Sequence, residues 1–236
     1  MELETGVLRI GAIQRTSLID YPGLISCVLF TQGCNFRCGY CHNPELLDAN
    51  NWSKPLLLDS IFNFLVKRVG KIDSVVITGG EPTLHLGLPD FIKKIKNMGF
   101  KVKLDTNGTN PEMLKGLLKD FLVDYIAMDV KAPLSKYSLI TGGDVRMDQI
   151  RSSINLIMSK APDYEFRTTV VEDQLDFADI LKLGADIKGA KRYYLQKFVP
   201  TKTNLSEFMD RQPPTDEILD EMRTALLDFV DFVGIR

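Results

Sequence analysis

Six short apolar segments alternate with amphipathic segments along most of this chain, and this alternation limits the possible folds more than any other feature. The apolar segments have the length and composition of buried strands and cover residues 24–31, 73–78, 100–105, 123–130, 164–171 and 192–199. The amphipathic segments are typical of helices and cover residues 57–69, 89–98, 111–121, 147–160, 176–186 and 215–230. Strands that are apolar throughout occur in parallel sheets covered by helices, and right-handed crossovers curl such a sheet. The chain is therefore predicted to be an α/β protein that forms a barrel or an open part of one.

The length of 236 residues allows one large domain or two small ones. The two longest connections, 132–146 and 199–214, are predicted to run over the surface, but neither has the composition of a flexible linker. We therefore expect a single domain over residues 1–236, with its core at about 20–200 and a C-terminal helix within 215–232.

The charge and hydropathy of the chain exclude several classes of partner. Lysine and arginine number 29 against 31 aspartate and glutamate, so a net charge of −2 offers no attraction to nucleic acid or to anionic membranes. The apolar runs are far shorter than the roughly 20 residues that cross a bilayer. The first residues, Met1 to Glu4, are acidic and lack the basic and apolar regions of a secretory signal. We expect a cytoplasmic protein with no nucleic-acid or membrane partner.

Three of the four cysteines lie within eight residues, at Cys34, Cys38 and Cys41. Clustered thiolates bind soft metals, so this segment is predicted to be a metal site. The fourth, Cys27, lies inside an apolar segment and is predicted to be a small buried side chain. His42 could complete a four-ligand zinc site, whereas a four-iron cluster held by three thiolates leaves one iron open. The spacing alone does not decide between zinc and iron.

Polar or glycine-rich segments follow the C-terminal ends of the predicted strands. They are Thr31-Gln32-Gly33-Cys34, Thr78-Gly79-Gly80-Glu81-Pro82, Asp105-Thr106-Asn107-Gly108 and Asp129-Val130-Lys131, while Arg167, Gln196 and Lys197 lie within the last two strands. In parallel β/α barrels the active site is built from the loops at this end of the strands. Each segment alone has a simpler interpretation, as a turn, a helix cap or an ion-paired residue. Their common position nevertheless predicts an enzyme with a composite site at the mouth of the barrel.

The motifs resemble those of the radical S-adenosylmethionine (radical SAM) superfamily. The resemblance rests on Cys34-x3-Cys38-x2-Cys41, with Tyr40 before the last cysteine, and on Gly79-Gly80-Glu81-Pro82. Further segments resemble the glycyl-radical-enzyme activating proteins, above all those of anaerobic ribonucleoside-triphosphate reductase that are similar to pyruvate formate-lyase activase. These segments are Ser17 to Gly23, Gln32 to Cys38, Cys41 to Pro44, Asp105 to Gly108 and Met128 to Lys131. The resemblance implies a partial (β/α)6 TIM-like barrel with a radical SAM core.

The resemblance also implies a cofactor role for each matching residue. Cys34, Cys38 and Cys41 would hold a single [4Fe–4S] cluster, whose open iron binds the amine and carboxylate of S-adenosylmethionine. The residues implied in S-adenosylmethionine binding are Tyr40 and His42 beside the adenine, Gly79, Gly80 and Glu81 at the methionine amine, Asp105, Asn107, Asp129 and Lys131 at the ribose and carboxylate side, and Arg167 at the carboxylate. Asp105 and Asp129 could share a monovalent cation, as in pyruvate formate-lyase activase. Where that activase has a histidine near the adenine, this sequence has Phe198, with Gln196 nearby.

The same resemblance implies a reaction and its partners. The reduced cluster would cleave S-adenosylmethionine to a 5′-deoxyadenosyl radical, which takes a hydrogen atom from a glycine of a partner glycyl radical enzyme. Asp20 would meet the glycine loop of this partner, and a flavodoxin or ferredoxin would supply the electron. The alternatives are a pyruvate formate-lyase activase, a small-molecule radical SAM enzyme of the 7-deazaguanine-forming type, and a structural zinc protein with its metal on the three clustered cysteines and His42.

Overall fold

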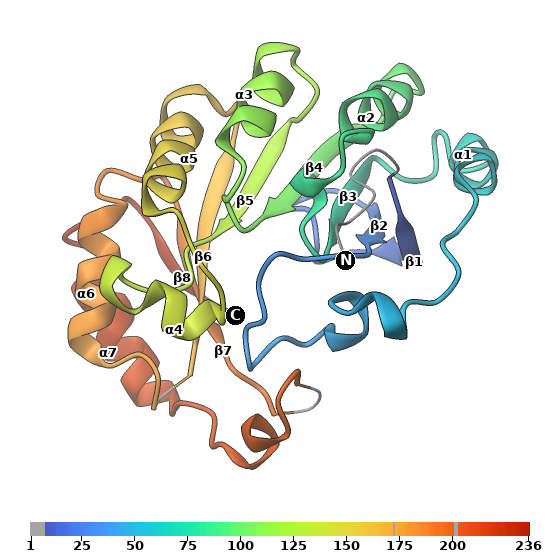
Figure 1. Ribbon diagram of the computed structural model, residues 1–236. Coiled ribbons are helices and arrows are strands. Elements are labelled where there is room, and N and C mark those ends of the chain that lie inside the picture. The colour runs from blue at the N-terminus through green and yellow to red at the C-terminus, as the bar shows by residue number, and fades with distance from the viewer. Residues whose placement is uncertain (1–7, 172, 201–202) are drawn as a thin grey trace.

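A single sheet runs through the molecule, and its strands lie side by side in the order in which they occur along the chain. The computed structural model describes residues 8–171, 173–200 and 203–236 (Figure 1). The strands are β1 (Ile10–Ser17), β2 (Ser26–Thr31), β3 (Ser74–Gly79), β4 (Lys101–Thr106), β5 (Tyr125–Asp129), β6 (Tyr164–Val170), β7 (Tyr193–Lys197) and β8 (Val233–Ile235). β1 is antiparallel to β2, and all other neighbouring pairs are parallel. The sheet curves without closing, which confirms the predicted partial TIM-like barrel (Figure 1).

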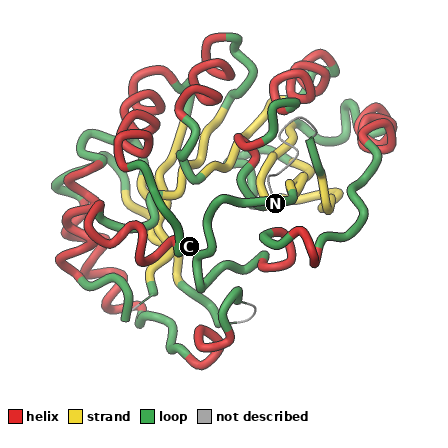
Figure 2. The backbone as a smooth tube through the Cα atoms, viewed as in Figure 1, coloured by secondary structure: helices red, strands yellow, loops and turns green. Residues whose placement is uncertain are grey.

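The helices lie on the outer side of the curved sheet (Figure 2). They are α1 (Leu58–Val66), α2 (Leu88–Asn97), α3 (Pro111–Lys119), α4 (Tyr137–Thr141), α5 (Met147–Lys160), α6 (Phe177–Asp186) and α7 (Asp216–Leu226). Short 3-10 turns are η1 (Pro44–Leu46), η2 (Ala49–Asn51), η3 (Pro82–Leu84), η4 (Leu134–Lys136) and η5 (Ser206–Asp210). Side-chain caps fix some of the helix starts, because Asn110 accepts a hydrogen bond from the Met113 amide and Asp176 forms a capping box with Asp179. The six predicted strands and the helices between them are therefore confirmed.

The two faces of the sheet have different chemistry. The outer face belongs to the main hydrophobic core, which includes Cys27, Leu104 and Phe166. Because side chains alternate along a strand, Lys103, Asp105, Glu165 and Arg167 point to the inner face. The sequence thus places charged side chains inside the barrel and keeps apolar ones beneath the helices.

Two edge strands differ from the sequence prediction, and the first and last predicted helices end early, the first (α1) at Val66 rather than near residue 69. The predicted strands did not include β1 or β8, which lie at the two edges of the sheet. The pairing of β1 shifts register between Ile10 and Ala12 and between Gln14 and Ser17, so its polar and apolar residues do not alternate regularly. The last helix ends at Leu226 rather than near residue 230, because the chain then turns to pair Val233 with Tyr193 of β7.

The two segments predicted to be long surface connections are in part buried, and that prediction was wrong. Segment 132–146 contains η4 and α4, in which Tyr137, Ile140 and Thr141 are buried. Segment 199–214, apart from residues 201–202, contains η5 with the buried Phe208. Both segments contact the chain around the clustered cysteines, through Thr141 and Leu205. Their apolar residues did not indicate this contact in the sequence.

Two expectations concern membranes and targeting. Among the described residues, no helix has both the length and the apolarity needed to cross a membrane. The N-terminal residues 1–4, whose composition predicts no secretory signal, lie outside the described residues.

Candidate active site

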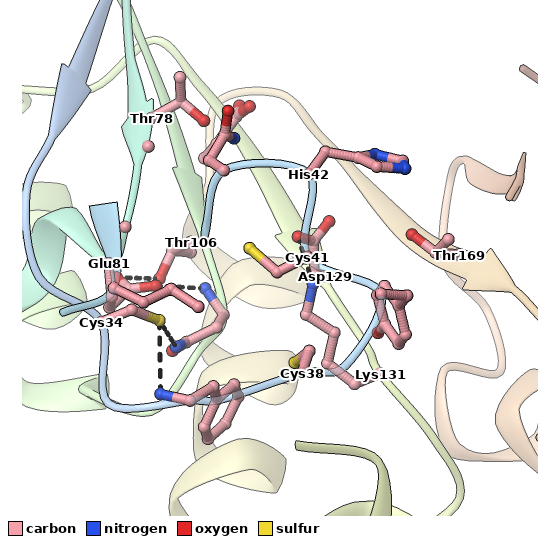
Figure 3. Close-up of a pocket in the computed structure, with 18 of the residues that line it drawn as sticks. Cys34, Cys38, Cys41, His42, Thr78, Glu81, Thr106, Asp129, Lys131 and Thr169 are labelled. Carbon is pink, nitrogen blue, oxygen red and sulfur yellow. Dashed lines mark hydrogen bonds and ion pairs between the residues drawn. The ribbon is translucent and has the colours of Figure 1, made fainter. Parts of the chain in front are cut away.

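A pocket of about 240 Å³ opens at the C-terminal ends of the strands. It is lined by the segments that follow β2, β3, β4 and β5 and by side chains of β6 and β7 (Figure 3). Its lining includes most of the residues singled out from the sequence, namely Cys34, Cys38, Tyr40, Cys41, His42, Gly79, Gly80, Glu81, Asp105, Asn107, Asp129, Lys131, Arg167 and Gln196. The fold therefore gathers into one cavity residues that are more than 160 positions apart in the sequence.

Two lining residues, Leu47 and Thr169, lie outside every motif and polar segment singled out from the sequence, and two residues that were given a role, Phe198 and Asp20, do not line the pocket. Phe36, Asn43, Thr78 and Thr106 also line it; they belong to segments that were singled out, but no role was given to them. The period of two along a strand would have indicated Thr169, since it shares a face of β6 with Arg167. Phe198 is fully buried and stacks against His42 without lining the pocket, and its place near the adenine stays a prediction. Asp20 lies in the turn after β1, where it accepts a hydrogen bond from the Ser17 hydroxyl.

The three clustered cysteines lie on an irregular loop, residues 33–43, which we call the cysteine loop. Burial raises the pKa of Cys34 to about 12 and also raises the pKa of Cys38 and Cys41. Without a metal these groups are neutral thiols, so a metal must displace their protons on binding. The Phe36 amide, 3.4 Å away, and the Asn107 side-chain nitrogen, 3.9 Å away, donate to the Cys34 sulfur. Such donors stabilise a thiolate once it forms.

The donor set fits a cluster with three thiolate ligands. In the described part of the chain, no three His, Cys, Asp or Glu side chains converge as around a single ion. A [4Fe–4S] cluster does not require the three cysteines to converge on one point, because each thiolate would bind a different iron. His42 has another role in this arrangement, since its Nε2 lies 3.0 Å from the carbonyl oxygen of Val199 and its ring stacks on Phe198. Cys27 is fully buried in the outer core, where burial raises its pKa to about 12.

The Gly79–Gly80 pair lets the β3 loop approach the cysteine loop. A Cβ on Gly80 would lie 2.0 Å from the carbonyl oxygen of Gly33, and Gly79 has a φ of 109°, which favours glycine. The Gly80 amide donates to the Thr31 carbonyl at 2.8 Å, and the Glu81 amide donates to the Gly33 carbonyl at 2.8 Å. These two amides are therefore used within the protein, and the glycines are required first by contact between two backbone segments.

The Glu81 carboxylate joins two loops of the site. Its Oε1 accepts hydrogen bonds from the Thr83 amide, the Thr83 hydroxyl and the Thr106 hydroxyl at 3.0, 2.5 and 2.8 Å. Its Oε2 accepts one from the Asn107 amide at 2.6 Å. The Asn107 side chain in turn donates to Asn35 at 2.9 Å. Hydrogen bonds from Asn107 thus connect the β3 loop through the β4 loop to the cysteine loop, where Figure 3 shows the contact with the Cys34 sulfur.

Five charged side chains form a continuous ion-pair network across the inner face, comprising Lys103, Asp105, Arg167, Asp129 and Lys131. Arg167 joins the two carboxylates, with its Nε 2.8 Å from Asp129 and an Nη 3.1 Å from Asp105. Lys103 pairs with Asp105 at 2.6 Å, and Lys131 with Asp129 at 2.9 Å. Burial alone would raise the pKa of both aspartates, but the cations outweigh it and lower both values. Three cations thus share two carboxylates, which suits a ligand that carries a carboxylate.

Known proteins share this architecture. The family model of the radical SAM superfamily matches residues 28–183. A Methanocaldococcus jannaschii protein named as a glycyl-radical enzyme activating enzyme is 34% identical over 235 residues, which cover 96% of this chain and 95% of that protein. The pyruvate formate-lyase-activating enzyme of Staphylococcus aureus is 30% identical, over 94% of this chain and 95% of that enzyme. The crystal structure of Streptococcus suis SuiB bound to S-adenosylmethionine matches 86% of this chain and 48% of that chain, with a TM-score of 0.66 at 15% identity.

These findings define the class of protein. The chain belongs to the radical SAM superfamily and is a radical SAM enzyme. Within that superfamily, the two relatives described above that match it over nearly their whole length are named as activating enzymes of glycyl radical enzymes or of pyruvate formate-lyase.

Proposed function

We propose that this protein activates a glycyl radical enzyme by removing a hydrogen atom from one glycine of that partner. The observation that carries the proposal is the pocket in which three thiols, the Gly79–Gly80 loop and the ion-pair network meet. The two nearly full-length relatives, both named for activation, support it independently. We take residues 1–236 as one radical SAM domain.

The chain's own residues bind and orient the reactants. When bound, the [4Fe–4S] cluster and S-adenosylmethionine supply one-electron cleavage of the sulfonium, giving methionine and a 5′-deoxyadenosyl radical that takes the glycine hydrogen. Cys34, Cys38 and Cys41 would hold the cluster, while Lys131 and Arg167 would bind the carboxylate of S-adenosylmethionine. Because a radical of this kind reacts with whatever it meets, orientation of one C–H bond is the main catalytic requirement. The electron would come from a flavodoxin or ferredoxin.

We revise two roles that the resemblance implies. We assign Glu81 to holding the β3 and β4 loops together, because both of its oxygens already accept hydrogen bonds. We further infer that Lys103 and Arg167 take the place of a monovalent cation between Asp105 and Asp129, because they already supply positive charge there. The remaining pocket residues keep the S-adenosylmethionine contacts implied by resemblance, with Phe198 behind His42.

The partner we propose is anaerobic ribonucleoside-triphosphate reductase, with pyruvate formate-lyase as the second candidate because of the Staphylococcus aureus relative. The test mixes anaerobically reconstituted protein, dithionite and S-adenosylmethionine with each candidate in turn. We expect the electron paramagnetic resonance signal of a glycyl radical in the reductase, with 5′-deoxyadenosine formed in equal amount. A glycyl radical that forms only in pyruvate formate-lyase would make that enzyme the partner in place of the reductase. Turnover of a small molecule with no radical in either protein would contradict the proposal, and a zinc-loaded protein that yields no 5′-deoxyadenosine would support the structural-metal alternative.

A further inference from the structure

The cysteine loop has no regular secondary structure of its own, so other parts of the chain must fix its shape. On one side it contacts α4, where the Arg37 amide donates to the Thr141 carbonyl at 2.7 Å and Phe36 packs edge-on against Tyr137. On the other side it contacts a segment that follows β7, residues 203–211, which we call the 203–211 segment. The residues of this segment do not line the pocket and were not singled out from the sequence.

Hydrogen bonds join the 203–211 segment to the cysteine loop. The Leu205 amide donates to the Gly39 carbonyl at 3.0 Å, and the Asn204 side chain donates to the Arg37 carbonyl at 3.4 Å. Just before this segment, the Val199 carbonyl oxygen lies 3.0 Å from His42 Nε2. The contacts therefore span the loop from Arg37 to His42, which includes two of the three cysteines.

Phe208 fills the space between the segment and the loop. Its side chain is buried, with its ring 6.3 Å from that of Tyr40 and 6.2 Å from that of Phe198, measured between centroids. The Arg211 guanidinium lies 3.9 Å from the centre of the same ring. Phe208 is thus held on several sides and cannot move aside cheaply.

Gly39 is required by this contact. A Cβ at position 39 would lie 2.2 Å from a ring carbon of Phe208, which is far inside van der Waals contact. The backbone of Gly39 is not in the left-handed region that demands glycine, since its φ is not positive. The glycine that follows Cys38 is therefore explained by the approach of the Phe208 ring.

We propose that Phe208 is a positioning residue: through Gly39 and Tyr40 it holds the cysteine loop in the shape that binds the cluster, and it excludes solvent from that side. The proposal rests on the cluster-binding part of the proposed function and is independent of which protein is activated. A ring that merely contributed to the core would affect unfolding of the chain without a specific effect on cluster retention.

The first test compares Phe208→Ala with Met209→Ala, a neighbouring change at a partly exposed side chain. Each reconstituted protein is mixed anaerobically with a ferrous-iron chelator, and iron release is followed by absorbance. We expect Phe208→Ala to release iron about 10-fold faster than the wild type, as for loss of other groups that orient metal ligands, and Met209→Ala to match the wild type. We also expect a changed electron paramagnetic resonance spectrum of the reduced cluster. Equal release rates and spectra in all three proteins would overturn the proposal.

The second test uses the contact with Gly39. Gly39→Ala alone should also accelerate iron release, because the new methyl group displaces the ring. In the double variant Gly39→Ala, Phe208→Ala the ring is absent, so the methyl group should add little further acceleration. If the two substitutions accelerate iron release independently, so that their fold-changes multiply in the double variant, the need for glycine at position 39 does not come from Phe208. If Phe208→Ala does not fold, Phe208→Leu replaces it in both tests under the same criteria. Iron release needs no partner protein, so a wild type that retains its cluster but activates no glycyl radical enzyme would contradict the proposed function alone.

Discussion

Glu81 is a fully buried carboxylate with hydrogen-bond donors on both oxygens. Burial raises its pKa, and the hydrogen bonds from Thr83, Asn107 and Thr106 oppose that rise. A carboxylate suits this position because it accepts on both oxygens, whereas an amide of the same shape presents a donor on one side. The residue therefore determines how the loops after β3 and β4 meet.

The variant Glu81→Gln should destabilise the protein by about 1–3 kcal/mol, because at least one buried donor then faces the amide NH₂ group. S-Adenosylmethionine should also bind more weakly, since Asn107 is no longer fixed. Urea unfolding of the metal-free protein and equilibrium binding would measure the two effects. Glu112→Gln, at an exposed helical position, is the matched control and should stay within about 0.5 kcal/mol. Equal stability of both variants would remove Glu81 from this role.

Arg167 controls the ionisation of two partly buried carboxylates, Asp105 and Asp129, whose pKa values lie below the ordinary 3.8. A lowered pKa in the folded state adds stability that is present above about pH 4 and is lost as the pH falls through the folded value. Arg167→Met should cost about 3 kcal/mol at neutral pH, the lower end for breaking a buried pair, because each aspartate keeps one lysine. Both pKa values should then rise, so the acid loss of stability should begin at a higher pH.

Unfolding free energy measured against pH, for the wild type, Arg167→Met and the exposed-pair variant Arg146→Met, would check this expectation. Arg146 and Asp148 are largely exposed, so that control should follow the wild-type curve. A curve for Arg167→Met that runs parallel to the wild type at every pH would show that Arg167 does not set these pKa values.

At the scale of elements, the buried strands were predicted from the sequence and the exposed edge strands were not. Strands buried on both faces, such as β3 and β5, appear in the sequence as apolar runs and were predicted. β1 has mostly exposed or half-exposed residues, and β8 has three residues, so neither carries a clear pattern. Their places are set by pairing with β2 and β7, which involves contacts distant in sequence. Local periodicity cannot report such contacts.

The position of β8 has a consequence that can be measured. Arg236 follows β8, and its guanidinium donates to both oxygens of the fully buried Glu165 at 2.8 and 3.0 Å. Arg236→Ala leaves that carboxylate with a hydrogen bond from Tyr125 but without this bidentate ion pair. We expect a loss of about 2–3 kcal/mol in urea unfolding, below the range for a fully buried pair because the arginine is itself 37% exposed.

Arg223→Ala is the matched control, because Arg223 pairs with Asp220 on the exposed side of α7. That variant should lose no more than about 1 kcal/mol. If Arg236→Ala is as stable as Arg223→Ala, β8 is held by its backbone pairing and not by the Glu165 ion pair.

At the scale of the whole molecule, the sheet separates a packed outer face from a reactive inner face. Most of the pocket residues could be predicted from the motifs and from their position after the C-terminal ends of the strands. Parallel strands bring these ends together. The sequence did not reveal that the Glu81 carboxylate and the amides of Gly80 and Glu81 are used within the protein, because their partners come from other loops. It also did not reveal the 203–211 segment, whose contact with Gly39 arises only in the folded chain.

The two faces also predict opposite outcomes for two cysteine substitutions. Cys38 lines the pocket, so Cys38→Ala should remove a cluster ligand and abolish iron binding and 5′-deoxyadenosine formation. Cys27 lies in the outer core, so Cys27→Ala should retain full iron and lose about 1 kcal/mol of stability from the small cavity. A ligand that binds the folded state alone stabilises it, so reconstitution should raise the unfolding midpoint of Cys27→Ala and leave that of Cys38→Ala unchanged. Iron content and thermal unfolding before and after reconstitution measure both effects. Full iron in Cys38→Ala, or iron loss in Cys27→Ala, would mean that the ligands are not the three cysteines of the loop.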